Sequence, residues 1–286
     1  MGGKLKHSNA DLAAEAQALR SYLALLDPSI LSRKIAKYEQ LARKIRSRQE
    51  IAKDIYDVIR ADSGGVGWAK LPCITRTLPG GARLFRIRGI ESDADVSEIK
   101  HLWQAPSVSV GAGRLNIPRE PLIYTSIDSP STAAYEVRMK PGDQFALIEY
   151  ESKIDLKYAL IGEYPKNDYL SVAERRKLDL ILGFLKDIFT QRTHPEESHV
   201  YVAPEIVVKS YYDWPVEIAQ AWGYGSVAAP SGTGYNVCFR PEVAKAYLQI
   251  NKASLGTFTL IDEHQVRADI HKVVAPVPNS SKLMTL

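Results

Sequence analysis

The hydrophobic period of the chain changes near residue 65, and this change constrains the fold more than any other feature. Up to about residue 61, apolar residues recur three and four positions apart, which is typical of amphipathic helices. From about residue 80, short stretches alternate between polar and apolar residues, as half-buried strands do, and further helical stretches lie between them. We therefore expect an α+β protein with a helical N-terminal part.

The helical part is predicted to be a hairpin of two helices. The first covers residues 9–26, and Asp27 followed by Pro28 is a start signal for the second. The second helix is expected to run to about residue 61, shortly before a Ser-Gly-Gly sequence that ends it. We assign residues 1–65 to this hairpin, whose apolar stripe must be buried against the rest of the chain or against another chain.

Positive charge is concentrated in the same part. The net charge is +4, yet residues 1–60 hold twelve Lys and Arg against seven Asp and Glu. Between Arg33 and Arg48 there are seven basic residues and one acid, Glu39. Such a basic helix can be a solvated face, or it can bind nucleic acid or an acidic partner. Tyr38 is the only aromatic residue in this stretch, so nucleic acid is the less favoured partner.

The mixed part is predicted to form one domain over residues 80–275, with a loose tail after about residue 275. Expected strands cover residues 83–88, 122–125, 145–150, 158–161, 224–227 and 236–240. Expected helices cover residues 132–139, 171–191, 199–208 and 216–222.

Composition points to a cytoplasmic protein. Two cysteines, Cys73 and Cys238, cannot form a disulfide framework and fit a reducing compartment. The first residues lack the apolar segment of a signal peptide, and no apolar stretch approaches the length of a membrane span. The histidines and cysteines show no metal-ligand spacing, so no metal is expected.

The most specific signal is a set of five separated segments. They are Leu84-Phe85-Arg86-Ile87, Gly113-Arg114-Leu115-Asn116, a strand ending in Tyr124 with a helix carrying Ala133-Ala134-Tyr135-Glu136-Val137, Tyr224-Gly225-Ser226-Val227, and Gly234-Tyr235-Asn236-Val237. In order and spacing they resemble the RES-domain family over about residues 80–250. Leu115 stands where the family often has an aromatic residue, and one glycine replaces the usual pair before Asn236.

The resemblance implies a fold like that of ADP-ribosyltransferase toxins and an activity that destroys NAD+. The family is named after an Arg, a Glu and a Ser, which correspond here to Arg86 or Arg114, to Glu136 and to Ser226, with Tyr124 beside them. It implies catalytic roles for Glu136, Ser226, Arg86 and Tyr124, and binding roles for Arg86, Arg114, Tyr124 and Asn236. NAD+ is then a substrate and no separate cofactor is expected, while inorganic phosphate is an open choice of acceptor.

These residue types also suit NAD+ on chemical grounds. Guanidinium groups such as those of Arg86 and Arg114 can bind a pyrophosphate with two hydrogen bonds. Tyr124 can stack against the cationic nicotinamide ring. Glu136 can stabilise the positive charge that develops on ribose as the glycosidic bond breaks. Ser226 fits a hydrogen-bonding role better than that of a nucleophile, because the sequence places no histidine beside it.

Three functions remain open at this stage. The first is hydrolysis or phosphorolysis of NAD+ by a toxin-like enzyme that a cognate antitoxin inhibits. The second is ADP-ribosylation of a protein by the same pocket. The third is non-catalytic binding of nucleic acid or a partner by residues 33–48. The hairpin is expected to serve assembly, through a homo-oligomer or an antitoxin contact.

Overall fold

The computed structural model describes residues 9–42, 44–63, 66–164, 170–190, 198–226, 228, 234–262 and 265–286. The chain divides into two compact units. Unit 1 comprises residues 1–76, 112–118 and 159–214, and unit 2 comprises residues 77–111, 119–158 and 215–286. The division falls within strands β3 (Ile74–Leu78) and β7 (Leu156–Ile161).

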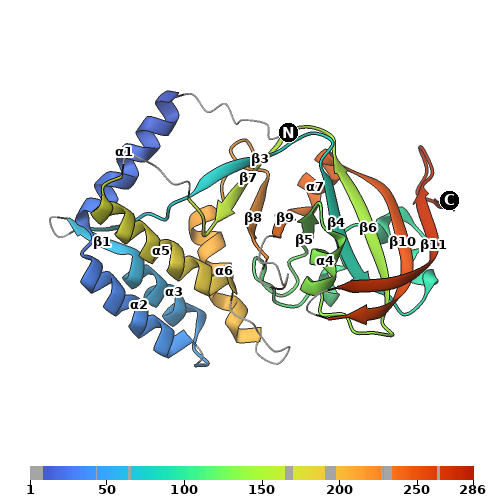
Figure 1. Cartoon of the computed structure of the whole chain (residues 1–286), viewed down its shortest axis with the longest axis horizontal. Helices are drawn as coiled ribbons and strands as arrows, with labels where there is room; N and C mark the ends of the chain where they lie inside the picture. The colour runs from blue at the N-terminus through green and yellow to red at the C-terminus, as the bar shows by residue number, and fades with distance from the viewer. Residues whose placement is uncertain are drawn as a thin grey trace. The chain divides into compact units, whose positions relative to one another are not determined.

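Unit 1 is mainly helical (Figure 1). Its elements are α1 (Asn9–Leu25), α2 (Pro28–Ala42), α3 (Arg48–Ile59), β1 (Arg60–Ser63), β2 (Val66–Ala69), α5 (Val172–Thr190), the 3-10 turn η4 (Ser198–Tyr201), α6 (Val202–Val207) and the π-helical turn η5 (Val208–Tyr212). Strands β1 and β2 form an antiparallel pair.

The apolar stripe of α2 is buried inside unit 1. Leu31, Ile35 and Tyr38 are buried, and α2 contacts both α3 and α5. The Tyr38 ring meets the Phe184 ring of α5 edge-on, with centroids 5.1 Å apart. An oligomer or an inhibitor that bound these helices would therefore have to use their polar faces.

The predicted second helix is wrong, because the structure breaks it into α2 and α3. Ser47 accepts a hydrogen bond from the Glu50 amide, and the Glu50 carboxylate accepts one from the Ser47 amide, so a capping box starts a new helix. The basic stretch 33–48 is consequently not one helix. The helix also ends at Ile59 and continues into β1, whereas the expected Gly64–Gly65 stop lies outside the described residues.

A charged pair joins α3 to α6 within unit 1. Arg48, the first residue of α3, donates two hydrogen bonds to the Glu205 carboxylate, with Nη2 and Oε1 3.1 Å apart. Glu205 is only 3% exposed, while more than half of the Arg48 side chain is exposed. Because a buried carboxylate needs its partner, the N-terminal helices and residues 202–207 depend on each other.

Unit 2 is built on an antiparallel sheet. Eight of its strands follow the order β12-β11-β10-β6-β4-β5-β9-β8, and the strand pairs whose registers are resolved are antiparallel (Figure 1). Its elements are β4 (Arg83–Gly89), η1 (Asp93–Val96), η2 (Ile99–Leu102), η3 (Ser107–Ser109), β5 (Ile123–Ile127), α4 (Pro130–Glu136), β6 (Gln144–Ser152), β8 (Ala221–Gly225), β9 (Tyr235–Phe239), α7 (Pro241–Tyr247), β10 (Leu248–Ile261), β11 (Val266–Pro276) and β12 (Leu283–Thr285).

The mixed helix-and-strand class is confirmed, and two local predictions are wrong. Residues 216–222 do not form a helix, because β8 begins at Ala221 and buries Trp222. The tail is not loose, since β12 pairs with β11. The structure also contains β10 and β11, a long antiparallel pair that was not predicted. Residue 227, the last of the strand predicted over 224–227, lies outside the described residues.

Candidate functional site

One face of the unit 2 sheet carries Asn236 together with three neighbours on adjacent strands. Phe85 on β4 is the register partner of Ser126 on β5, Ser126 is the partner of Asn236 on β9, and Asn236 is the partner of Tyr224 on β8. Partners in an antiparallel sheet point to the same side. These four side chains therefore form a row across one face.

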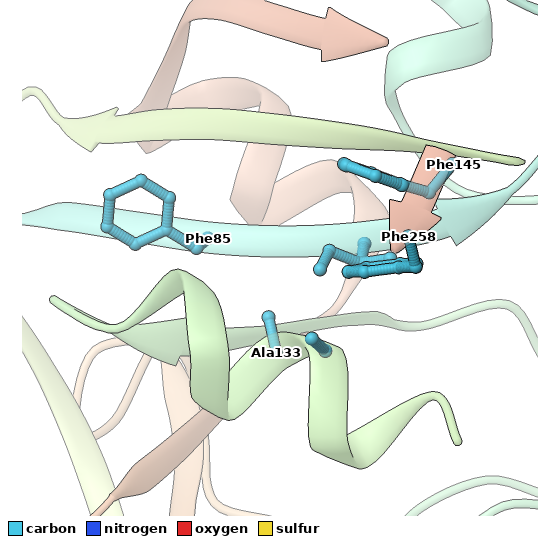
Figure 2. Close-up of a cluster of buried hydrophobic side chains, with 6 residues drawn as sticks. Phe85, Ala133, Phe145 and Phe258 are labelled. Atoms are coloured by element: carbon cyan, nitrogen blue, oxygen red, sulfur yellow. The ribbon is translucent and has the colours of Figure 1, made fainter. Parts of the chain in front are cut away.

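Helix α4 packs on that same face. Its start is fixed by Ser129, whose hydroxyl accepts a hydrogen bond from the Thr132 amide, with Pro130 in the first turn. Ala133 and Ala134 pack into a buried cluster with Phe85, Ile87, Phe145 and Phe258. Figure 2 shows Ala133 facing these rings. The Phe145 and Phe258 rings are stacked, with their centroids 4.1 Å apart. This packing fixes the position of the last residue of α4, Glu136.

Glu136 is held by two donors from the neighbouring strands. Its Oε1 atom accepts a hydrogen bond from the Ser226 hydroxyl at 2.6 Å and another from Asn236 Nδ2 at 2.7 Å. Ser226 and Asn236 are buried, whereas Glu136 is partly exposed. In the part of the chain that the structure describes, no group donates to Oε2. One carboxylate oxygen is thus anchored, and the other can accept a hydrogen bond from a ligand.

A glycine allows Ser226 to reach this position. The Ser226 amide donates to the Gly234 carbonyl at 2.7 Å, just before β9 begins. A Cβ atom on Gly234 would lie 2.9 Å from the Thr132 side chain and 3.4 Å from Ser226 Cβ. Gly234 therefore lies close to both α4 and the residue after β8, where a larger side chain would press against Thr132.

Asn236 has a second buried partner, which the sequence reasoning missed. The Ser126 hydroxyl donates to Asn236 Oδ1 at 2.9 Å. Ser126 lies inside a segment used for the family resemblance, two residues after Tyr124. Because side chains alternate along a strand, the sequence could have placed Ser126 on the same face as Tyr124. It does not indicate which residue of β9 pairs with Ser126.

Tyr124 lies on the same face as the cluster. It is two residues from Ser126 along β5, which corresponds to about 7 Å of strand, and its register partner on β9 is Cys238. Its side chain is partly exposed. The structure thus gathers Glu136, Ser226 and Asn236 into hydrogen-bond contact and places Tyr124 on the same side of the sheet.

Arg86 points to the opposite side. Its register partner is Ile148, while Phe85 beside it shares the face of Ser126. The Arg86 guanidinium donates to the Trp103 carbonyl. It also lies near Tyr150, whose pKa is raised mainly by burial and is lowered in smaller part by Arg86. The structure does not bring Arg86 together with Glu136.

Arg114 belongs to unit 1. Its guanidinium donates to the Phe189 carbonyl at the end of α5 and stands 5.8 Å from the centroid of the Tyr201 ring. The segment turns tightly there, because the Gly113 amide donates to the Asn116 carbonyl, and Leu115 is fully buried. The residue that replaces the family's aromatic therefore serves the core of unit 1.

The arrangement suits a charge-stabilising carboxylate more than a nucleophile. The Ser226 hydroxyl donates a hydrogen bond to Glu136, and a carboxylate held in this way can bind a hydroxyl group or stabilise developing positive charge. Among the described residues, no three His, Cys, Asp or Glu side chains come together as metal ligands. The described helices also include none with the length and apolar character needed to cross a membrane.

Comparison of the sequence with protein-family models and with curated proteins finds no match.

Proposed function

We propose that the chain is a RES-type enzyme that degrades NAD+ by cleaving the bond between nicotinamide and ribose. The observation that carries the proposal is the Glu136–Ser226–Asn236 cluster, in which two buried donors hold one oxygen of a partly exposed carboxylate. The three residues come from three separate segments of the resemblance, and Ser226 and Asn236 lie 90 and 100 residues after Glu136. Their contact supports the reading that those segments build one site.

In the proposed reaction, the bond between ribose C1 and the nicotinamide nitrogen breaks, and its electron pair leaves with nicotinamide. Water then adds to C1 and releases a proton, which gives ADP-ribose. With inorganic phosphate as acceptor, a phosphate oxygen bonds to C1 instead. No acid is needed for departure, because the leaving group is already cationic. Glu136 stabilises the oxocarbenium-like state through Oε2.

The other residues support that carboxylate or the substrate. Ser226 and Asn236 orient Glu136, and Tyr124 offers an aromatic surface on the same side of the sheet. We build the site without Arg86, because its guanidinium supports the Trp103 carbonyl on the other face.

We place this activity in the cytoplasm. We also propose that the protein is a toxin that a cognate antitoxin inhibits. Both cysteines are buried thiols that form no disulfide, which agrees with that setting. A partner would bind the polar outer faces of the N-terminal helices, since their apolar stripe is covered. The break between α2 and α3 makes nucleic-acid binding by residues 33–48 the weaker alternative.

The decisive test is incubation of the purified full-length chain with NAD+, with and without inorganic phosphate. We expect free nicotinamide, together with ADP-ribose or its phosphorylated form. Glu136→Gln should lower turnover by about 100- to 1,000-fold, which is the usual effect of losing one preorganised electrostatic group. Glu91→Gln, an exposed acid-to-amide change in unit 2, is the matched control.

The products separate the alternatives. ADP-ribose attached to an added protein would favour the transferase function over hydrolysis and phosphorolysis. Intact NAD+ after prolonged incubation would contradict both enzyme functions. Full turnover by a folded Glu136→Gln protein would remove the proposed role of the cluster.

A further inference from the structure

We propose that Ser126 is a positioning residue of this site, which fixes the end of the Asn236 amide that faces Glu136. The inference rests on the proposed function for its kinetic consequence. Its geometric basis is separate, because it depends only on hydrogen bonds inside unit 2. Ser126 is 2% exposed and Asn236 is 3% exposed, so neither can exchange these contacts for bulk water.

The hydrogen bonds run from Ser126 through Asn236 to Glu136, and the chemistry of Ser126 and Glu136 decides which group donates in each bond. An ionised carboxylate can only accept hydrogen bonds, so Asn236 must present its Nδ2 donor to Glu136. That orientation leaves Asn236 Oδ1 to find a donor elsewhere. The Ser126 hydroxyl lies 2.9 Å from it and supplies that donor.

Backbone pairing brings the three groups together. Ser126 and Asn236 are register partners on β5 and β9 and point to the same face. Helix α4 covers that face and ends in Glu136. Ser126 therefore acts on Glu136 only through Asn236, and no direct hydrogen bond between Ser126 and Glu136 is needed.

Loss of the Ser126 hydroxyl removes one of the two hydrogen bonds that hold the Asn236 amide. In Ser126→Ala, Oδ1 of Asn236 loses its buried donor, which costs free energy in the conformation that presents Nδ2 to Glu136. Flipping the amide does not recover this cost, because it would set Oδ1 against Glu136 Oε1, where two acceptors repel each other. The amide is then held by Glu136 alone, so it positions the carboxylate less firmly.

The chain offers a matched control one residue away. Thr125 is also buried, and its hydroxyl donates to the Val237 carbonyl at 2.7 Å. It lies on the same strand but on the opposite face, as its position in the strand requires. Thr125→Val therefore removes a comparable buried hydrogen bond without touching the cluster.

Steady-state kinetics of NAD+ consumption provide the first measurement. We expect Ser126→Ala to lower kcat by about 10- to 100-fold, the range seen when an outer partner of a functional side chain is lost, with KM changed little. Ser126→Thr, which keeps the hydroxyl, should recover most of kcat, and Thr125→Val should retain it. Three results would overturn the proposal. In the first, Ser126→Ala has the same kcat as Thr125→Val, and in the second, Ser126→Ala changes only KM. In the third, Ser126→Thr is as slow as Ser126→Ala.

The second measurement does not need activity. The side-chain amide protons of Asn236 can be followed by NMR through their chemical shifts and exchange with solvent. Ser126→Ala and Glu136→Gln should both shift these signals and speed their exchange, whereas Thr125→Val should not. If the wild-type chain leaves NAD+ intact but shows this pattern, the proposed function fails and the positioning role stands. Unchanged Asn236 signals in Ser126→Ala would refute the positioning role whatever the activity.

Discussion

At the scale of single residues, Oε1 of Glu136 accepts two hydrogen bonds, and the two donor residues are held in place by different parts of the backbone. Ser226 comes from the end of β8, where its amide is tied to the Gly234 carbonyl, and Asn236 lies within β9. Both side chains donate to the same atom. Either one alone leaves the carboxylate with a single attachment, about which it can turn.

This shared target makes the two donors non-additive. Ser226→Ala and Asn236→Ala should each lower kcat by at least 10-fold, while the double variant should lose less than the product of the two single losses. The reason is that either variant alone already frees the carboxylate to rotate. A double-mutant cycle on kcat measures the coupling, and strictly multiplicative losses would show that the donors act independently.

The same scale shows where sequence reasoning succeeds and where it stops. Glu136, Ser226 and Asn236 could be proposed from sequence because each sits in a segment with a distinctive local pattern. Arg86 could not be placed, since Phe85, Arg86 and Ile87 lie on a strand whose two faces are both covered. Alternation shows which residues of such a strand share a face. The register with β5 and β6 decides which of the two faces lies against α4.

At the scale of elements, helix starts were more predictable than strands. The Asp27-Pro28 signal begins α2 as predicted, and α4 begins at Pro130, two residues before its predicted start. The start of α3 was also readable, because Ser47 and Glu50 have capping-box spacing, but the apolar stripe continues on both sides and hides the break. Strand β10 carries irregular pairing at Ile250, Leu255 and Phe258, which destroys the simple alternation that would reveal it.

The cap of α2 gives a prediction about pH. The Asp27 carboxylate accepts hydrogen bonds from the Ser29 hydroxyl and from the Ser29 and Ile30 amides. These bonds, led by that from the Ser29 hydroxyl, lower the pKa of Asp27 below its ordinary value. A lowered folded-state pKa contributes stability that is present above the unfolded-state pKa of about 3.9 and is lost as the pH falls through the folded-state pKa.

Asp27→Asn should remove this pH dependence while keeping a capping side chain, because asparagine caps helices about as well as aspartate. Urea unfolding of both proteins at pH 6 and near pH 3 provides the measurement. The variant should lose less stability than the wild type between the two pH values. An identical loss in both proteins would mean that the Asp27 carboxylate contributes nothing to acid sensitivity.

At the scale of the whole molecule, unit 1 is assembled from three stretches of chain. The N-terminal helices supply Tyr38, which meets Phe184, and Arg48, which pairs with buried Glu205. The sequence suggested that the hairpin of residues 1–65 is separable, because all of it precedes the segments that resemble the RES domain. Sequence order carries no information that residues 159–214 return to pack with it.

Deletion of residues 1–60 should therefore cause aggregation instead of releasing an active domain. It would uncover the apolar face of α5 and leave Glu205 buried without Arg48. Light scattering and circular dichroism of the truncated protein test this, with Ile30→Lys, an exposed position on α2, as a full-length control. A truncated chain that remained monodisperse with native secondary structure would contradict the dependence.

The interleaving of the two units also governs the order in which the protein can mature on the ribosome. Unit 1 lacks its last segment until residue 214 has been translated, and at about 5–20 residues per second the stretch from residue 76 to residue 214 takes roughly 7–28 s. The donors of Glu136 emerge later still, and the strands that cover α4 follow them, since β10 ends at Ile261. A nascent chain thus carries Glu136 without its hydrogen-bond partners, so the cluster can assemble only after residues 226–261 have been synthesised.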